Sequence, residues 1–441
     1  MDLPEIKKDP KKEKSEAPEK NQNIILVVAL PGVAVAEKFV EFKKKNDNKY
    51  RIAVIHNAKA ANKEEEEAFS KFDIAIICDF DDPKSIVDNL RPYRDELLAV
   101  TCRMESRIEW FRKLVPFVPY LRTPTSESLS WSTNKIEMRK RFLEFDKTIA
   151  PAFHVVSDAK KKTLTTVEEK VGYPLVVKPS GLAQSLLVSI GYHKEELEKT
   201  LKGAFKTINR IYKGRGQTTE PQILVEQQME GELYSIDAYV DSRGKVTCCP
   251  LVAVKTGRAI GFDDFFGYQQ MTPANVKKES IAEAEEAVRK AVHALGLRST
   301  TAHVELMRTE EGWKIVEVGP RIGGFRDVMY RLSYGIDHTE NDIFTRIPKT
   351  VSVPQKIKGY TVAFKFFAKK EGKITTLTGI KKAQQLKSFH SITINKKIGD
   401  KAVFAKNGGT SIFNMFLFNE DRSKLLADIR RLEQMIKIET E

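Results

Sequence analysis

Short apolar runs alternate with helical stretches between residues 23 and about 125. The runs NIILVVAL, RIAVIH, FDIAIICDF and ELLAVTC are apolar over most of their length, which indicates strands buried on both faces of a sheet. Most are followed by a stretch with helical spacing, and this alternation is typical of parallel strands joined by helices. The pattern predicts a Rossmann-like α/β layer over residues 23–130. The turn LPGVAVAE lacks the glycine spacing of a dinucleotide site.

The pattern changes over residues 131–346, where strands, hairpins and helices mix in an α+β arrangement. The predicted helices are NKIEMRKRFLEF, HKEELEKTLKGAFKTINRIYK and ESIAEAEEAVRKAVHALGL; the predicted strands include YPLVVKPSG, ILVEQQ, ELYSIDAYV, the hairpin KVTCCPLVAVK, and the strand–turn–strand HVELMRTEEGWKIVEV. The linker IPKTVSVPQ then leads to a third predicted unit, residues 352–441. It is rich in strand patterns and closed by the helix SKLLADIRRLEQMIK.

Charge is distributed unevenly along the 441 residues, whose formal net charge is +14. Residues 1–22 contain six lysines and six acidic residues and no apolar periodicity, so we expect a neutral, disordered tail. Residues 352–441 hold 18 Lys and Arg against 8 Asp and Glu, a net +10, which leaves +4 for the rest. The basic character therefore belongs to the C-terminal unit, where it suits anionic small molecules or nucleic acid.

Several classes of protein are disfavoured by composition. The longest apolar run, Ile24 to Ala36, is interrupted by Pro31-Gly32 and is shorter than the ~20 residues that a bilayer requires, so no membrane association is expected. The charged N-terminus lacks the apolar segment of a secretory signal. Four cysteines without C-x-x-C spacing argue against a disulfide framework or a zinc ribbon and favour a reducing, cytoplasmic location.

The hairpin HVELMRTEEGWKIVEV carries the strongest chemical signal. A three-residue loop, Glu310-Glu311-Gly312, would place Glu305 directly opposite Glu317 on one face of the ladder. Like charges in directly opposed positions are destabilising unless a cation lies between them, and Mg²⁺ with its oxygen ligands would serve. In the other interpretation the register differs by one residue and one carboxylate points to solvent. The hairpin alone leaves both interpretations open.

Further candidates surround this hairpin in the sequence. Arg321, in GPRIGG, suits a phosphoryl group or a carboxylate, and the two glycines after it expose backbone amides that would line an anion site; a surface salt bridge and an ordinary turn are the alternatives. Lys178 ends an apolar strand before a small-residue loop, and Lys135 begins a helix, so both are candidate phosphate ligands, although single lysines are usually solvated. The strand exit at residues 226–231 would offer backbone atoms to an adenine edge and a carboxylate to a ribose hydroxyl or an amine; an ordinary strand exit is the alternative.

The order of these parts resembles the ATP-grasp superfamily over about residues 24–345. Within it, HVEL followed by E-x-G-x-R-x-G-G is similar to the L-amino-acid ligases of the dipeptide and carnosine type, and the basic C-terminal unit resembles their biotin-carboxylase-like architecture. The resemblance implies a Rossmann-like pre-ATP-grasp domain (23–130), a two-subdomain ATP-grasp domain (131–346) and a β-rich C-terminal domain (352–441).

The resemblance also implies roles for individual residues. Catalytic roles fall to Arg321, Lys178 and His303; ATP contacts to Lys135, Lys178, Ser180, Gly181, Ser185, Glu226, Gln227, Gln228, Met229 and Glu232; and metal binding to Glu305 and Glu317. His303 lies on the strand face of Glu305, and a packed histidine is the equal alternative. Three departures stand out. Gly319 replaces a frequent Asn ligand, the phosphate loop SGLAQSLLV is poor in glycine, and Leu233 stands where relatives have Glu, with Glu232 one residue early.

The implied function is an ATP-dependent carboxylate–amine ligase that works through an acyl phosphate and requires Mg²⁺, with Mn²⁺ as a substitute. Its partners would be a small-molecule carboxylate and an amine, and relatives are commonly dimers. Two alternatives remain: a carboxylase-type or regulatory ATP-binding protein of the same fold, and a nucleic-acid-binding module. The latter would use the C-terminal lysines and the phenylalanines among them, which are more often core residues of strands.

Overall fold

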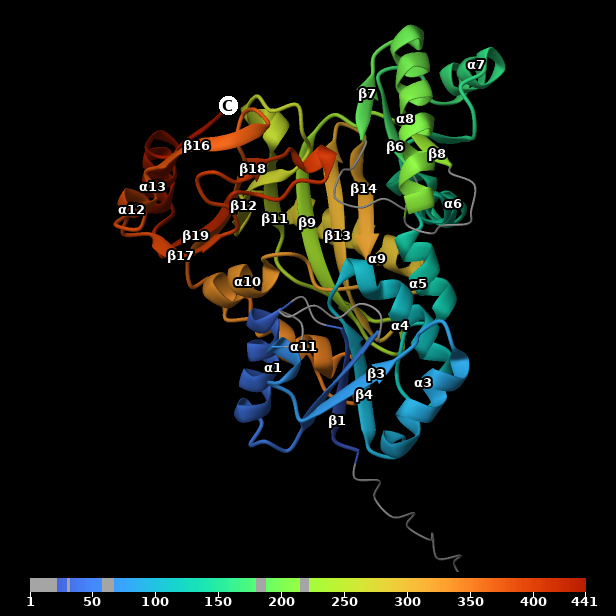
Figure 1. Cartoon of the computed structure of the whole chain (residues 1–441), viewed down its shortest axis with the longest axis vertical. Coiled ribbons are helices and arrows are strands. Elements are labelled where there is room, and N and C mark those ends of the chain that lie inside the picture. Colours follow the sequence, from blue (N-terminus) through green and yellow to red (C-terminus); the bar gives the residue numbers. More distant parts are fainter. Residues whose placement is uncertain (1–21, 30–31, 58–66, 180–187, 215–221) are drawn as a thin grey trace, which may run out of the picture.

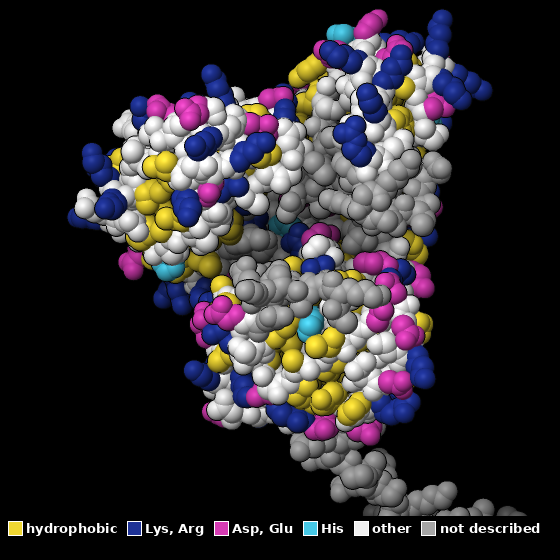
Figure 2. Space-filling model, viewed as in Figure 1, with side chains coloured by type: hydrophobic (Ala, Val, Ile, Leu, Met, Phe, Trp, Pro, Cys, Tyr) yellow, Lys and Arg dark blue, Asp and Glu magenta, His cyan; other side chains and the backbone are white. Residues whose placement is uncertain are grey.

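The computed structural model describes residues 22–29, 32–57, 67–179, 188–214 and 222–441. Three groups of elements make up the molecule (Figure 1), and its surface is hollowed between them (Figure 2). A blue parallel layer lies at the bottom of Figure 1, a green helix-and-strand unit rises at the upper right, and a long sheet runs from the centre into the red C-terminal part. The site described below lies where the last two groups meet.

A four-stranded parallel sheet forms the first layer, as the alternating apolar runs predict. Its spatial order is β3-β2-β1-β4, with β1 (Ile24–Val28), β2 (Arg51–Asn57), β3 (Ile74–Cys78) and β4 (Leu97–Cys102). The helices of this layer include α1 (Val33–Lys45), α3 (Pro83–Leu90) and α4 (Ile108–Leu114). Helix α11 (His338–Phe344) comes from much later in the chain. It buries Ile343 in the apolar cluster that contains Ile25 and Val27, and so joins this layer to the rest of the molecule.

The green unit of Figure 1 is a smaller, antiparallel sheet that positions Lys178. Its order is β5-β8-β6-β7, with β5 (Phe153–Val156), β6 (Leu175–Pro179), β7 (Ser189–Gly191) and β8 (Ile223–Gln227). Helices α7 (Lys161–Lys170) and α8 (Lys194–Gly214) bury their apolar stripes on it through Leu164, Leu197 and Leu201. The amphipathic spacing that predicted α8 reflects this packing.

The longest sheet combines the middle of the chain with its C-terminal part. Its nine strands run β14 (Gly312–Gly319), β13 (Thr300–Thr309), β9 (Glu232–Val240), β11 (Val252–Thr256), β12 (Gly267–Thr272), β15 (Tyr360–Phe366), β19 (Phe413–Asn419) and β17 (Phe389–Ile394), with β10 (Val246–Cys248) paired to β9. Because β12 pairs antiparallel with β15, the predicted boundary between residues 346 and 352 does not separate two sheets.

Helices cover this sheet on both sides of the site. Helix α6 (Lys135–Phe145) follows α5 (Ser126–Thr133), and α9 (Lys278–Ala294) packs against β13 and β14. Helix α10 (Arg326–Tyr334) packs against β15. Asn134 caps α6, because its side-chain oxygen accepts hydrogen bonds from the amides of Ile136 and Glu137. The cap fixes the start of the helix, and with it the position of Lys135.

The C-terminal segment differs from its sequence prediction at its end and agrees with it in the burial of its phenylalanines. Helix α13 (Arg422–Met435) does not close the chain, because β20 (Lys437–Thr440) follows it and pairs with β16 (Gly372–Thr378) in a three-stranded sheet with β18 (Lys401–Ala402). Phe364 and Phe366 are buried in an apolar cluster with Phe413. These rings are core residues and are not available to stack on bases, so the nucleic-acid interpretation keeps only the basic charge in its support.

Two further expectations can be compared with the structure. All four cysteines are free thiols, in agreement with the absence of a disulfide framework. In the part of the chain that the structure describes, the helices are too short or too polar to cross a bilayer.

Candidate active site

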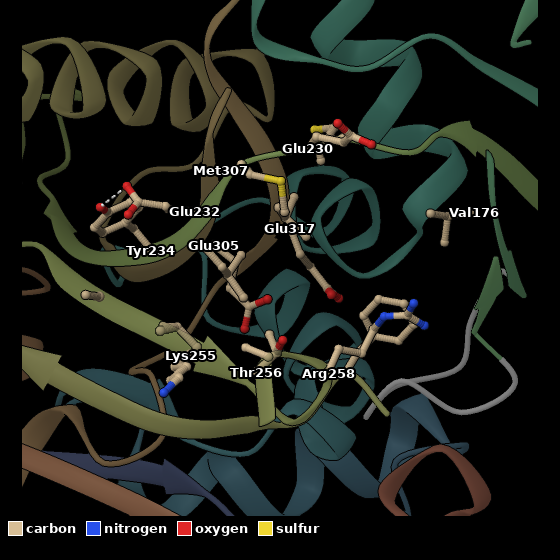
Figure 3. A pocket seen from close by; sticks show the side chains of 18 of the residues that line it. Val176, Glu230, Glu232, Tyr234, Lys255, Thr256, Arg258, Glu305, Met307 and Glu317 are labelled. Atoms are coloured by element: carbon tan, nitrogen blue, oxygen red, sulfur yellow. Dashed lines mark hydrogen bonds between the residues drawn. The ribbon is translucent and has the colours of Figure 1, made fainter. Parts of the chain in front are cut away.

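A cavity of about 840 Å³ opens between the small sheet, helix α6 and the long sheet. Its wall carries most of the residues predicted from the sequence. These are Lys135, Lys178, Glu226, Gln227, Gln228, Met229, Glu232, Glu305 and Glu317. Figure 3 shows that the carboxylates of Glu305 and Glu317 point into this space from adjacent strands, with Thr256 and Arg258 beyond them. Residues separated by almost 200 positions in the sequence therefore line one cavity.

The register of the β13–β14 hairpin places Glu305 opposite Glu317. The predicted three-residue loop is wrong, since Thr309 pairs with Gly312 and only Glu310 and Glu311 lie between them. A bulge at Val316 adds one residue to β14 and shifts the register between Glu305 and Leu306. The bulge restores the predicted pairing, so the two carboxylates share one face of the hairpin.

Glu317 forms an ion pair with Lys135 at the start of helix α6. The Nζ atom of Lys135 lies 2.7 Å from Oε1 of Glu317, and Lys135 is the more deeply buried of the two side chains. Burial lowers the pKa of Lys135, but attraction to Glu317 outweighs this and raises the pKa overall. Lys135 therefore stays protonated and offsets the repulsion between Glu317 and Glu305.

Glu305 is held ionised by histidine and arginine side chains. Burial alone would raise its pKa, but His303, Arg326 and Arg321 lower it to about 2. His303 lies on the same strand face, as the sequence predicts, with Nε2 at 3.6 Å from Oε1 of Glu305. At neutral pH Glu305 thus presents a carboxylate to the cavity, which is the protonation state that metal binding requires.

A buried network fixes His303 from behind. Asp237, on β9 directly opposite His303 in the ladder, accepts from its Nδ1 at 2.6 Å and from Nε2 of His338 at 2.7 Å. Burial would raise the pKa of Asp237, but the two histidines hold it well below its usual value. Oδ2 of Asp237 also accepts from the amide of Gly323 at 2.8 Å. The expectation that this amide lines an open anion site is therefore wrong, because an internal carboxylate already occupies it.

Glu226 differs most from its expected surroundings. It was expected at the nucleotide base, but its side chain is buried and both oxygens contact cations: Oε1 lies 2.5 Å from Nε of Arg139, and Oε2 accepts from Nζ of Lys178. Burial raises its pKa, whereas Arg139 and Lys178 together lower it to about 2. Glu226 thus anchors Lys178 at the cavity wall, and neither of its oxygens is free for a ribose.

The strand exit after Glu226 keeps the features expected of an adenine site. Gln227, Gln228 and Met229 line the cavity, and Oε1 of Gln228 is buried without a hydrogen-bond partner among the described residues. An unsatisfied buried acceptor is costly, and an exocyclic amine of a purine would satisfy it. Met229 adds the apolar contact that an aromatic base favours.

Glu232 lies at the rim of the cavity. Its carboxylate accepts from the hydroxyl of Tyr234 at 2.9 Å (Figure 3) and also pairs with Arg308. Burial raises the pKa of Tyr234 to about 12, and the hydrogen bond to Glu232 contributes. Because the side chain of Glu232 is 62% exposed, one oxygen remains accessible to a ligand at the rim.

Arg321 is paired across the boundary between two layers. Its Nε atom lies 2.6 Å from Oε2 of Glu105, which belongs to a short helix after β4. A Cβ atom at Gly319 would lie only 3.0 Å from this Glu105 oxygen, so the missing side chain at position 319 leaves room for the Glu105 carboxylate. Arg321 is thus held beside β14 by an ion pair that the sequence did not reveal.

Ser180, Gly181 and Ser185, expected to contact phosphate, lie outside the described residues. Arg139, Asp237, His338 and Glu105 were missed by the sequence analysis. Arg139 left a signal, because it lies four positions after Lys135 and therefore on the same helix face. The other three did not, since each reaches the site through a contact between distant segments.

The residues present suit a divalent cation with oxygen ligands. Among the described residues no group of three or more acidic, histidine or cysteine side chains forms a complete metal cage, so the two glutamates supply a partial set. Mg²⁺ commonly binds through one or two carboxylates and completes its octahedron with water and phosphate oxygens. Glu305 and Glu317 fit that pattern, because both carboxylates face a cavity large enough for a nucleotide.

Comparison with known proteins assigns the domain. Residues 171–328 match the family described as "ATP-grasp domain", so the chain contains an ATP-grasp domain. The fold is similar to that of an L-amino acid ligase from Bacillus licheniformis, with a TM-score of 0.77, 18% identity, and coverage of 96% of this chain and 100% of that one. It is also similar to N5-carboxyaminoimidazole ribonucleotide synthetase from Thermotoga maritima, with a TM-score of 0.67, 16% identity, and coverage of 95% and 100%.

Curated relatives are similar over shorter stretches. A D-alanine–D-alanine ligase from Bacillus velezensis is 27% identical over 190 residues, which cover 40% of this chain and 48% of the relative. A formate-dependent phosphoribosylglycinamide formyltransferase from Ignicoccus hospitalis is 25% identical over 203 residues, covering 46% and 48%. The chain thus spans about half the length of these relatives.

Proposed function

We propose that the protein is an ATP-dependent carboxylate–amine ligase that activates its carboxylate substrate as an acyl phosphate. The observation that carries this proposal is the pairing of Glu305 with Glu317 on one wall of the cavity that Lys135 and Lys178 also line. Catalysis of phosphoryl transfer consists largely of positioning and charge neutralisation, and this wall offers both.

In this proposal the base of ATP lies at Gln227–Met229, and its phosphates extend toward Lys178. Lys178 is positioned for this role by Glu226, whose second oxygen is held by Arg139. Glu305 and Glu317 would hold Mg²⁺, which neutralises charge on the phosphates when bound. Lys135, now paired with Glu317, would contribute a further positive charge beside the same phosphates.

The chemistry then needs no nucleophilic side chain. The substrate carboxylate attacks the γ-phosphorus of ATP, and ADP leaves with an acyl phosphate formed. The amine next attacks the acyl carbon, and phosphate departs from the tetrahedral intermediate. Arg321 carries the positive charge that suits the oxyanion of this intermediate. His303, fixed by Asp237, stays close to Glu305 throughout and helps to orient that carboxylate.

A second candidate keeps the phosphoryl-transfer step but uses bicarbonate as the carboxylate. Its support is the structural similarity to N5-carboxyaminoimidazole ribonucleotide synthetase, together with Gly319, which leaves the glutamate pair without a neighbouring Asn oxygen. In either case we expect small-molecule substrates and a homodimer.

The test is a substrate screen with purified full-length protein. The protein, ATP and Mg²⁺ are incubated with the twenty common L-amino acids, singly and in pairs, or with bicarbonate and the same amines. ADP formation and product mass are measured. A ligase gives ADP that depends on an amino acid and a product of the summed masses less water. Bicarbonate-dependent ADP without a condensed product supports the second candidate. ADP formation that depends on neither addition would contradict both.

A further inference from the structure

Lys365 differs from the other lysines of the basic C-terminal segment in its surroundings. It lies on β15, where alternate residues face opposite sides of the sheet. Thr361 and Ala363 share its side, and Ala363 is buried against α10 in a cluster with Met329 and Phe325. The Nζ atom of Lys365 lies 5.2 Å from the centre of the Phe325 ring. The side chain therefore lies beside the start of α10, on the same face of the long sheet as Glu305.

The groups around Lys365 are mostly cationic. Burial lowers its pKa, and Arg326 and Arg321 lower it further, while Glu305 acts in the opposite direction. Arg321 is paired with Glu105. Arg326 is buried, where its guanidinium donates to Gln270 at 2.7 Å and to Ser235 at 2.5 Å. In the part of the chain that the structure describes, Lys365 has neither a hydrogen bond nor an ion pair, whereas Arg321 is ion-paired and Arg326 is hydrogen-bonded.

A partly buried ammonium without an anionic partner is unfavourable, and a ligand carboxylate would relieve that cost. The carboxylate of Glu305 acts on Lys365 electrostatically and partly offsets this cost. In the proposed ligase a metal ion offsets the negative charge of Glu305. The positive charges of Lys365, Arg321 and Arg326 then outnumber the negative charges near them. Lys365 does not line the nucleotide cavity, whereas Glu305 does, so the two side chains have access to different ligands near one reacting centre.

We propose that Lys365 binds the carboxylate group that the enzyme phosphorylates. This inference rests on the proposed function and assigns its carboxylate subsite to the C-terminal part of the chain. A carboxylate on Lys365 would lie beside Glu305, where the proposed metal and γ-phosphate meet. The ion pair positions the substrate, and Lys365 takes no part in proton transfer.

The experiment compares Lys365→Met with Lys369→Met, a matched variant in which an exposed lysine just beyond the same strand is removed. The probe is whichever L-amino acid serves as the best acyl donor for the wild type in the screen. We measure KM for that amino acid, KM for the amine, and the Kd of a non-hydrolysable ATP analogue. Lys365→Arg keeps the charge, and thermal melting checks that each variant folds.

We expect Lys365→Met to raise KM for the acyl donor at least about tenfold, since hydrogen bonds between charged groups contribute ~1.5–3 kcal/mol. The Kd of the ATP analogue should stay unchanged, Lys365→Arg should recover most of the loss, and Lys369→Met should match the wild type. An unchanged KM in a folded Lys365→Met variant would overturn the inference and leave the ligase intact, and so would an equal loss of ATP affinity. A wild type without carboxylate-dependent ADP formation would overturn both proposals.

Discussion

At the scale of single residues, the negative charge of Glu317 is the feature on which the proposed metal site depends. Glu317→Gln keeps the size of the side chain and removes the charge that a divalent cation and Lys135 both require. We expect at least about a hundredfold lower kcat and weaker Mn²⁺ binding in the presence of an ATP analogue, measured by electron paramagnetic resonance. Glu310→Gln, at the exposed tip of the same hairpin, is the control. Wild-type Mn²⁺ affinity in Glu317→Gln would place the metal elsewhere.

Lys178 permits a separate test of the phosphate contacts. In Lys178→Ala, Glu226 keeps its partner Arg139, so the fold should persist while a positive charge leaves the cavity wall. We expect the affinity for ATP to fall about tenfold or more, which isothermal titration calorimetry would measure. Lys170→Ala removes an exposed lysine from α7 of the same unit and should bind ATP normally. Unchanged ATP affinity in Lys178→Ala would refute the assignment.

The lowered pKa of Glu226 implies that the free energy of unfolding depends on pH. Its pKa is about 2 in the folded protein, below the usual 4.5, so the ionised group stabilises the fold above pH 4.5, and this contribution is lost as the pH falls toward 2. Glu226→Gln leaves Arg139 and Lys178 without their anion and should reduce the free energy of unfolding by ~3 kcal/mol at pH 7. In urea unfolding the gap to wild type should narrow between pH 5 and pH 3. A gap that is constant with pH would contradict this explanation.

At the scale of elements, local pattern predicted more than tertiary pairing did. The parallel layer and the long helix α8 follow from periodicity, because each buries an apolar face. Strand β12 was missed, although it joins the two halves of the long sheet, because GYQQMT has no clear alternation. The pairing of Glu305 with Glu317 was predicted correctly, but from a three-residue loop that the structure does not have. The bulge at Val316, which the sequence does not reveal, produces the same pairing.

The ion pair between Glu105 and Arg321 connects the layer of β4 to the loop after β14. If Glu105 orients Arg321, Glu105→Gln should lower kcat about tenfold and leave the affinity for ATP unchanged, since neither residue lines the nucleotide cavity. Steady-state kinetics with ATP binding measured in parallel gives this separation of kcat from affinity. Glu109→Gln, on the following helix, is the control, because the ion pair that Glu109 forms is with Arg112 and not with Arg321. If Glu105 acts through Arg321, the double variant Glu105→Gln/Arg321→Lys should have the same kcat as Arg321→Lys alone. Coupling is refuted if the effects of the two single substitutions on kcat add.

At the scale of the molecule, the interlocking of the chain explains why domain boundaries were harder to predict than elements. Composition divides the sequence near residue 350, where the charge becomes strongly positive and a linker intervenes. Two contacts nevertheless join the three predicted units. Helix α11 packs into the N-terminal layer, with Asp342 accepting from Thr101 of β4 at 2.7 Å, and β15 pairs with β12. Such contacts depend on pairing between distant segments, for which one sequence offers no local signal.

Continuity of the long sheet predicts that the C-terminal part cannot be removed. Deleting residues 352–441 would strip β12 of its neighbour β15 and expose Phe266, Tyr268 and Met271, which are buried against Phe364 and Phe413. An unpaired strand with an exposed apolar face aggregates readily. We therefore expect residues 1–351 to be insoluble or to lack a cooperative melting transition.

Phe364→Ala in the full chain provides a milder version of the same test. The ring is fully buried between the two halves of the sheet, so its loss should cost ~3–5 kcal/mol and lower the melting temperature of the whole protein in one transition. Two separate transitions, or a truncated protein that melts cooperatively and binds ATP, would mean that residues 352–441 form an independent domain. A single transition would make the C-terminal segment part of the fold that carries the active site, which is also what a substrate contact through Lys365 requires.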